Sequence, residues 1–80
     1  MEHHISSLVV HGRPQAIEAL TTAIGAIAGA EVPIADPRGK LVVTLETTSE
    51  AGITDALARI SLLDGVLAAT LVFHHVEEDA

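Results

Sequence analysis

The sequence predicts an α+β fold in which the order strand–helix–strand occurs twice. Two segments carry apolar residues at helical spacing, and each lies between segments rich in β-branched residues. The two halves also echo each other, because Ile24-x-x-Ile27-x-Gly29 precedes one strand and Ile60-x-x-Leu63-x-Gly65 precedes another. Two right-handed strand–helix–strand units joined by a hairpin predict the ferredoxin-like βαββαβ arrangement. Its four-stranded antiparallel sheet has the order 4-1-3-2, with both helices on one face.

The first half begins with a strand at residues 5–11, which Gly12-Arg13-Pro14 ends. Pro14 suits the first turn of a helix, where its missing N–H leaves no hydrogen bond unmade. The apolar stripe of this helix consists of Ile17, Leu20, Ile24 and Ile27. Gly25 lies off the stripe and weakens the helix slightly, and Gly29 ends it.

The second half begins inside a hairpin. Strands at residues 30–35 and 40–46 flank Asp36-Pro37-Arg38-Gly39, which has Asp, Pro and Gly at the positions that a type I turn favours. Thr47 and Glu50 have the spacing of a capping box for the second helix. That helix carries a stripe of Ile53, Leu57 and Ile60, and Asp64-Gly65 ends it. A last strand at residues 66–75 and an acidic tail at residues 76–80 complete one domain over residues 1–80.

The composition excludes several classes of function. The chain has 80 residues and a formal net charge of −7, from 11 acidic and four basic residues. Nucleic acid would be repelled, whereas a basic partner would be attracted. The sequence contains no cysteine, which excludes disulfides and thiolate zinc sites. No apolar run approaches the roughly 18 residues of a membrane span, and the N-terminal residues lack the basic region of a signal peptide. We expect a cytoplasmic protein that is not inserted in a membrane.

The last strand is apolar on both faces, because Thr70 is the only polar residue between Val66 and Phe73. Two helices cover one face of the sheet, and a solvated antiparallel face should be polar at alternate positions. Strand alternation assigns to the helix side Leu8, Val10, Leu41, Val43, Leu45, Ala69, Leu71 and Phe73. It assigns to the open side Ser7, Val9, Val42, Thr44, Thr70, Val72 and His74. Val66 can face the helices only if a bulge shifts the phase of the strand.

Val72, Val9 and Val42 lie on adjacent strands of this sheet and form an apolar floor. Such a surface is often a binding face, but valine is also common on exposed sheets because it favours the pleated backbone. Both interpretations stay open here, as does a homodimer through the two open faces. We expect a monomer or a weak homodimer.

Few side chains in the sequence are candidates for metal binding or catalysis. His3-His4 and His74-His75 come close together if the first and last strands pair, and their imidazoles could bind Zn²⁺ or Ni²⁺. Adjacent strand residues point to opposite faces, so we favour solvated strand ends and assign no metal site. Ser6-Ser7 lacks a glycine elbow and a base at a defined spacing. With no cofactor loop and no paired carboxylates either, the sequence predicts that the protein is not an enzyme and uses no cofactor.

The sequence resembles the NapD family over nearly its whole length. The resemblance rests on the order and spacing of these segments: Ser6-Ser7-Leu8-Val9-Val10, Gly29-Ala30-Glu31-Val32, Gly39-Lys40-Leu41-Val42-Val43 with Glu46 following, Gly65-Val66-Leu67-Ala68, and Leu71-Val72-Phe73-His74-His75 before an acidic end. Phe73 departs from the tyrosine expected of the family, so the ring can still pack there but carries no hydroxyl.

The resemblance implies a cytoplasmic chaperone with a ferredoxin-like fold. It implies binding to the twin-arginine signal peptide of NapA, the catalytic subunit of periplasmic nitrate reductase, so that export waits for insertion of the molybdenum cofactor and folding. An apolar floor and acidic rim suit a peptide with an apolar segment and a basic region. The predicted peptide-binding residues are Ser7, Val9, Val42, Thr44, Glu46, Thr70, Val72 and His74.

Two alternatives remain at this point. The peptide could lie on the sheet as a helix or add to a sheet edge as a strand, and the sequence does not distinguish these modes. A small regulatory or metal-sensing domain is a second functional hypothesis, which rests on fold analogy alone.

Overall fold

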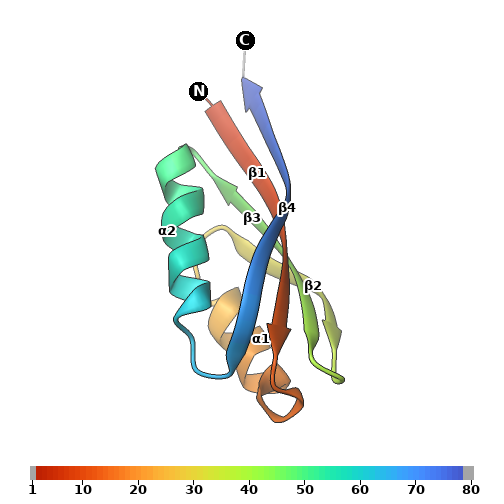
Figure 1. Ribbon diagram of the computed structural model, residues 1–80. Helices are drawn as coiled ribbons and strands as arrows, with labels where there is room; N and C mark the ends of the chain where they lie inside the picture. The colour runs from red at the N-terminus through yellow and green to blue at the C-terminus, as the bar shows by residue number, and fades with distance from the viewer. Residues whose placement is uncertain (1, 79–80) are drawn as a thin grey trace.

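The computed structural model describes residues 2–78. In chain order its elements are β1 (Glu2–Gly12), a 3-10 turn (Pro14–Ala16), α1 (Ile17–Gly25), β2 (Ala30–Asp36), β3 (Lys40–Thr47), α2 (Glu50–Ser61) and β4 (Val66–Glu78). The strands form one antiparallel sheet in the order β2-β3-β1-β4, and both helices pack on the same face of it (Figure 1). The predicted ferredoxin-like fold is therefore confirmed.

The hydrophobic core lies between the sheet and the two helices. Alternate residues of the two central strands point into it, and the completely buried apolar ones are Leu8, Val10, Leu41, Val43 and Leu45. The helices contribute Ile17, Leu20, Ile24, Ile53, Ala56 and Ile60. Each large aliphatic side chain buried in this way contributes about 1.5–3 kcal/mol. The helix-side assignment for β1 and β3 is confirmed.

The sequence pattern that recurs in the two halves corresponds to a connection from helix to strand that is also repeated. Within residues 24–30 and again within residues 60–66, two successive backbone hydrogen bonds of 3.0–3.2 Å span three residues each and end at the first residue of a strand. Gly29 and Gly65 occupy the same place in the two connections, with φ of 82° and 94°. Only glycine adopts these angles without strain, so each glycine fixes where its strand begins.

β1 and β4 are longer than predicted. The two strands pair over their whole length, from Glu2 opposite Glu78 to Gly12 opposite Val66. Residues 76–78 therefore belong to β4 and are not part of an acidic tail. Residues 79 and 80 of the predicted tail lie outside the described residues.

The predicted capping box at Thr47 is wrong. Ser49 is the N-cap of α2, and its Oγ accepts a hydrogen bond of 3.1 Å from the amide of Gly52. Thr47 is still part of β3, and its Oγ1 donates a hydrogen bond of 2.6 Å to the carbonyl oxygen of Ser49. The chain therefore needs two more residues after the strand before the helix can begin.

A bulge near the start of β4 brings Val66 to the helix side, as the prediction required. Gly12 lies opposite Val66, whereas the preceding residue His11 lies opposite Ala68, so Leu67 is the extra residue. Val66 packs against the core, and Leu67 is exposed.

A second bulge, which the sequence analysis missed, lies at Val72. Leu8 pairs with Leu71 on the helix side, whereas Ser7 pairs with Phe73 on the open side. The extra residue reverses the alternation of the rest of β4, because a one-residue shift exchanges the two faces. The helix-side assignment of Phe73 is therefore wrong.

Gly29→Ala and Gly25→Ala should have opposite effects on stability. A Cβ at Gly29 would collide with the carbonyl oxygen of Glu46, at a positive φ, so we expect Gly29→Ala to lower the free energy of unfolding by more than about 1 kcal/mol. A Cβ at Gly25 meets no atom within 4 Å, and we expect a gain of about 0.5 kcal/mol from helix propensity. Urea denaturation of both variants measures the difference. Equal effects would mean that the turn tolerates a side chain at Gly29.

Candidate functional site

The face of the sheet away from the helices, which we call the open face, is not covered by any element within residues 2–78 (Figure 1). Cross-strand pairing aligns its side chains in rows. One row runs from Ile34 through Val42 and Val9 to Thr70, and its neighbour includes Thr44, Ser7 and Phe73. The open face thus carries an apolar floor of Ile34, Val42 and Val9 on three strands, bordered on β4 by Thr70 and Phe73.

Most of the predicted peptide-binding residues share this face. The register brings together Ser7, Val9, Val42, Thr44, Glu46 and Thr70. Val72 lies in the bulge of the edge strand and is 58% exposed. Its position beside the floor agrees with the prediction only in part, because a bulged residue does not follow the alternation.

The open-side assignment of His74 is wrong. The bulge at Val72 makes His74 the partner of Ser6, on the helix side, and its Nδ1 lies 2.7 Å from Ser6 Oγ. His75 takes the open side instead, opposite Ile5.

Phe73 is the open-face residue that sequence reasoning missed. Its ring is 54% exposed and stacks on that of His75, with centroids 6.3 Å apart and an angle of 20° between the planes. The chain's only Phe, Tyr or Trp side chain is therefore exposed to solvent beside the apolar floor. The segment from Val66 to Phe73 does not alternate between apolar and polar residues. That signal could have suggested a bulge, but not its position.

A pocket of about 500 Å³ lies at one end of the open face, where β3 ends and β2 begins. Glu31 and Glu46 bring carboxylates to it, and Ile5 and Thr44 contribute to its walls. The His3 imidazole lies beside them, with Nδ1 3.8 Å from Glu46 Oε1. The backbone of Glu46 is fixed by a hydrogen bond of 2.9 Å from its amide to the carbonyl oxygen of Gly29. This pocket can accept a cationic group next to an apolar surface.

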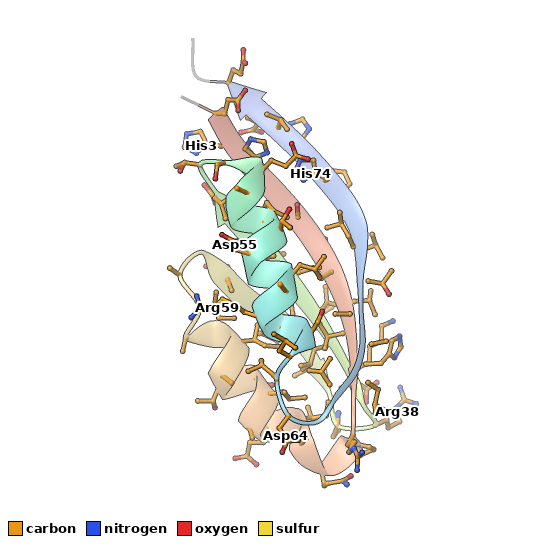
Figure 2. All side chains as sticks on the ribbon, turned by 60° about the vertical axis from the view of Figure 1, so that its left-hand side comes forward. His3, Arg38, Asp55, Arg59, Asp64 and His74 are labelled. Carbon is orange, nitrogen blue, oxygen red and sulfur yellow. The ribbon has the colours of Figure 1, made fainter. Side chains whose placement is uncertain are left out.

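Most of the basic residues lie at the opposite end of the sheet. Three of the four Lys and Arg residues, Arg13, Arg38 and Lys40, belong to the turns and strand ends there. Figure 2 shows Arg38 at the far end of the molecule from His3 and His74. Arg38 Nη2 lies 2.8 Å from Asp36 Oδ2, and hydrogen bonds from Arg38 lower the pKa of Asp36 to about 2. The carboxylates of the pocket and most of the basic residues therefore lie at opposite ends of the sheet.

The structure places Ser6, one of the two adjacent serines considered in the sequence, beneath the surface. Ser6 is completely buried, so its hydroxyl cannot reach a substrate. No group of three or more His, Cys, Asp or Glu side chains within residues 2–78 is placed to hold a metal ion. In the same part of the chain, no helix has the length and apolar character to cross a membrane. A small α+β protein with one uncovered apolar face is typical of a module that binds other chains.

Comparison with known proteins identifies the family. The model of the NapD protein family matches residues 3–78, and the chain belongs to this family of chaperones. Chaperone NapD of Haemophilus influenzae is 32% identical over 76 residues, covering 94% of this chain and 82% of that protein. Chaperone NapD of Escherichia coli K12 is 33% identical over 75 residues, covering 92% and 86%.

The fold agrees with a solved structure of the family. The solution structure of the E. coli Tat proofreading chaperone protein NapD superposes with a TM-score of 0.84 at 32% identity, covering 98% of this chain and 83% of that one. The resemblance drawn from the sequence is confirmed.

Phe73→Ala tests which face the ring occupies. On the open face the ring is half exposed, so we expect the free energy of unfolding to fall by less than about 1.5 kcal/mol. Leu8 is completely buried on the neighbouring strand β1, and Leu8→Ala should lower the free energy of unfolding by about 2–5 kcal/mol. Urea denaturation of both variants gives the comparison. A Phe73→Ala loss as large as that of Leu8→Ala would mean that the ring packs in the core.

Proposed function

We propose that this protein binds the twin-arginine signal peptide of the periplasmic nitrate reductase catalytic subunit, NapA, in the cytoplasm. By holding that peptide it delays export until the cofactor is inserted and the enzyme is folded. The single observation that carries the proposal is the open face, with its apolar floor and its acidic pocket at one end. A two-part ligand, apolar in one segment and basic in another, matches this two-part surface.

The apolar segment of the peptide would cover the floor. Ile34 and Phe73, which are 57% and 54% exposed, have the most surface to lose, and Val9 and Val42 lie between them. Apolar burial yields about 25 cal/mol per Å², so a few such side chains can supply most of a modest affinity. The order of the strands makes Val9 and Val42 the centre of the contact.

The arginines would meet the acidic pocket. Glu31 and Glu46 can accept hydrogen bonds from guanidinium groups, in the bidentate geometry that makes such pairs strong. The net charge of −7 also steers a basic peptide toward the protein, an effect that salt weakens.

Docking on the face is favoured over addition of a strand at an edge. The outer edge of β4 is interrupted by bulges at Leu67 and Val72. The outer edge of β2 contains Pro33, which has no N–H, and a register shift between Glu31 and Ile34. Bulges and proline both prevent continuous pairing with a further strand.

A helical peptide satisfies its own backbone and fits the face. Four strands about 4.8 Å apart make a surface about 14 Å wide, and a helix with side chains is about 10–12 Å across. Its positive N-terminal end would lie near Glu46, and its negative C-terminal end near Lys40. The arginines precede the apolar segment, so the same orientation serves both parts of the peptide.

Val9→Glu should abolish peptide binding without unfolding the protein. The substitution buries a carboxylate under the apolar segment, and we expect the dissociation constant to rise at least about 30-fold. Calorimetry with a peptide that contains two arginines and an apolar run measures this. Leu62→Glu is the matched control, because Leu62 is 85% exposed and lies just after α2, in the helix layer. Normal binding by Val9→Glu would exclude the open face as the site.

Glu46→Gln should weaken binding and should be coupled to the arginines. We expect an affinity loss of about 2- to 10-fold, because ion pairs near a surface are weak. The loss should vanish when both arginines of the peptide are replaced by glutamine, which a double-mutant cycle detects. Asp64→Asn is the matched control. It removes the same charge just before β4 starts, at the other end of the sheet, and should not change the affinity for either peptide. If Glu46→Gln lowered the affinity equally for the peptide with arginines and the peptide with glutamines, Glu46 would not pair with the arginines.

A further inference from the structure

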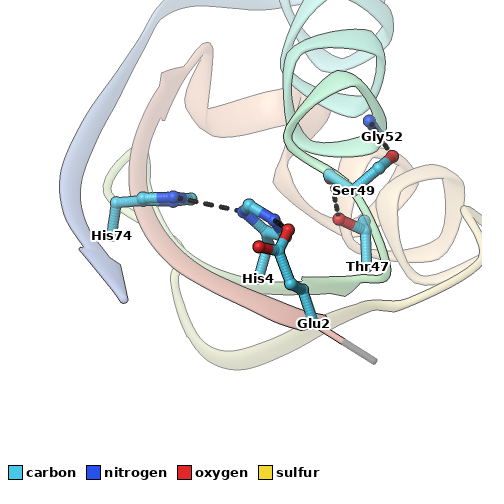
Figure 3. A network of polar contacts seen from close by, with 6 residues as sticks. All are labelled: Glu2, His4, Thr47, Ser49, Gly52 and His74. Atoms are coloured by element: carbon cyan, nitrogen blue, oxygen red, sulfur yellow. Dashed lines mark hydrogen bonds and ion pairs between the residues drawn. The ribbon is translucent and has the colours of Figure 1, made fainter. Parts of the chain in front are cut away.

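Four side chains form a hydrogen-bonded chain on the helix side of the sheet, at the end where β1 begins. Glu2 Oε1 lies 3.2 Å from His4 Nε2, His4 Nδ1 lies 3.4 Å from His74 Nε2, and His74 Nδ1 lies 2.7 Å from Ser6 Oγ. Figure 3 shows Glu2, His4 and His74 converging from two adjacent strands. The open-face function described above uses none of these contacts.

The carboxylate determines which nitrogen of His4 is free. An ionised Glu2 only accepts hydrogen bonds, so the proton of a neutral His4 must be on Nε2. The lone pair of His4 Nδ1 therefore points toward His74 Nε2. Ser6 Oγ can either donate to His74 Nδ1 or accept from it, so His74 can present its own Nε2 as a donor or as a lone pair.

The spacing of the two facing nitrogens suits a shared metal ion. A zinc ion bonded to both at about 2.05 Å would span the 3.4 Å between them with an angle of about 110°, close to the tetrahedral value. The ring centroids, 5.4 Å apart, agree with two imidazoles directed at one point. Glu2 and Ser6 contact the outer nitrogens of the two rings. This arrangement is typical of histidine ligands, which usually donate their other N–H to a carboxylate or another oxygen.

We propose that His4 Nδ1 and His74 Nε2 form a two-histidine site for Zn²⁺, with Glu2 and Ser6 as the partners that orient the rings. Water completes the coordination. His4 is only 6% exposed and Ser6 is completely buried, so half of the site is fixed before the ion arrives. Two protein ligands make an exchangeable site, weaker than a structural zinc centre with four.

The proposal selects one histidine from each adjacent pair. His3 lies on the open side, near Glu46, and His75 lies there too, with Nε2 3.5 Å from Glu77 Oε1. Strand alternation separates both from the His4–His74 pair. Bound zinc would join β1 to β4 beyond the bulge at Val72, where β4 is exposed.

Calorimetry with ZnCl₂ on the chain without a polyhistidine tag, at pH 7.5, tests the site. We expect saturable binding of one ion and a rise in Tm with zinc concentration. His74→Ala should weaken the affinity at least about 10-fold, whereas His75→Ala, the matched control on the neighbouring residue, should leave it unchanged. No saturable binding, or equal losses in the two variants, would overturn the proposal.

A measurement on the unmodified protein guards against a variant that fails to fold. Long-range ¹H–¹⁵N NMR spectra report each imidazole nitrogen separately, and zinc should shift the resonances of His4 Nδ1 and His74 Nε2. Shifts confined to the rings of His3 and His75 would overturn the proposal.

Discussion

The structure depends on one constraint: two helices can cover only one face of a four-stranded sheet. All completely buried side chains of β1 and β3 point toward α1 and α2, so the opposite face is left to solvent or to a partner. A face in contact only with solvent would be expected to carry mainly polar residues. This one carries Ile34, Val42, Val9 and Phe73 among the polar residues Ser7, Thr44 and Thr70. Under the proposed function, the bound signal peptide would cover that surface.

The two bulges of β4 connect this constraint to the chemistry of the site. The first keeps Val66 in the core and the second sends Phe73 outward and His74 inward. The extra residue at Val72 therefore places the chain's only phenylalanine on the open face and brings His74 next to His4 on the other side. Because bulges also disturb the outer edge of β4, they favour a ligand that lies on the face.

The sequence was sufficient to predict the order of elements, the strand order and the core faces of β1 and β3, because periodicity and turn residues determine them locally. It also indicated that Val66 could face the helices only if a bulge shifted the strand, since alternation alone would leave that residue in water. It could not predict the bulge at Val72, because apolar residues on both sides of that position fit either phase. The N-cap at Ser49 and the pocket at Glu46 could not be predicted either, because both depend on the residue at which β3 ends.

The central claim is that the open face is where a peptide docks. Isotope-filtered NMR, with labelled protein and an unlabelled peptide that contains two arginines and an apolar run, tests it most directly. Docking on the open face predicts intermolecular NOEs from the methyl groups of Val9, Val42 and Ile34. NOEs confined to the helix layer, at Leu62 and Ile27, or to the outer edge of β4 would contradict it.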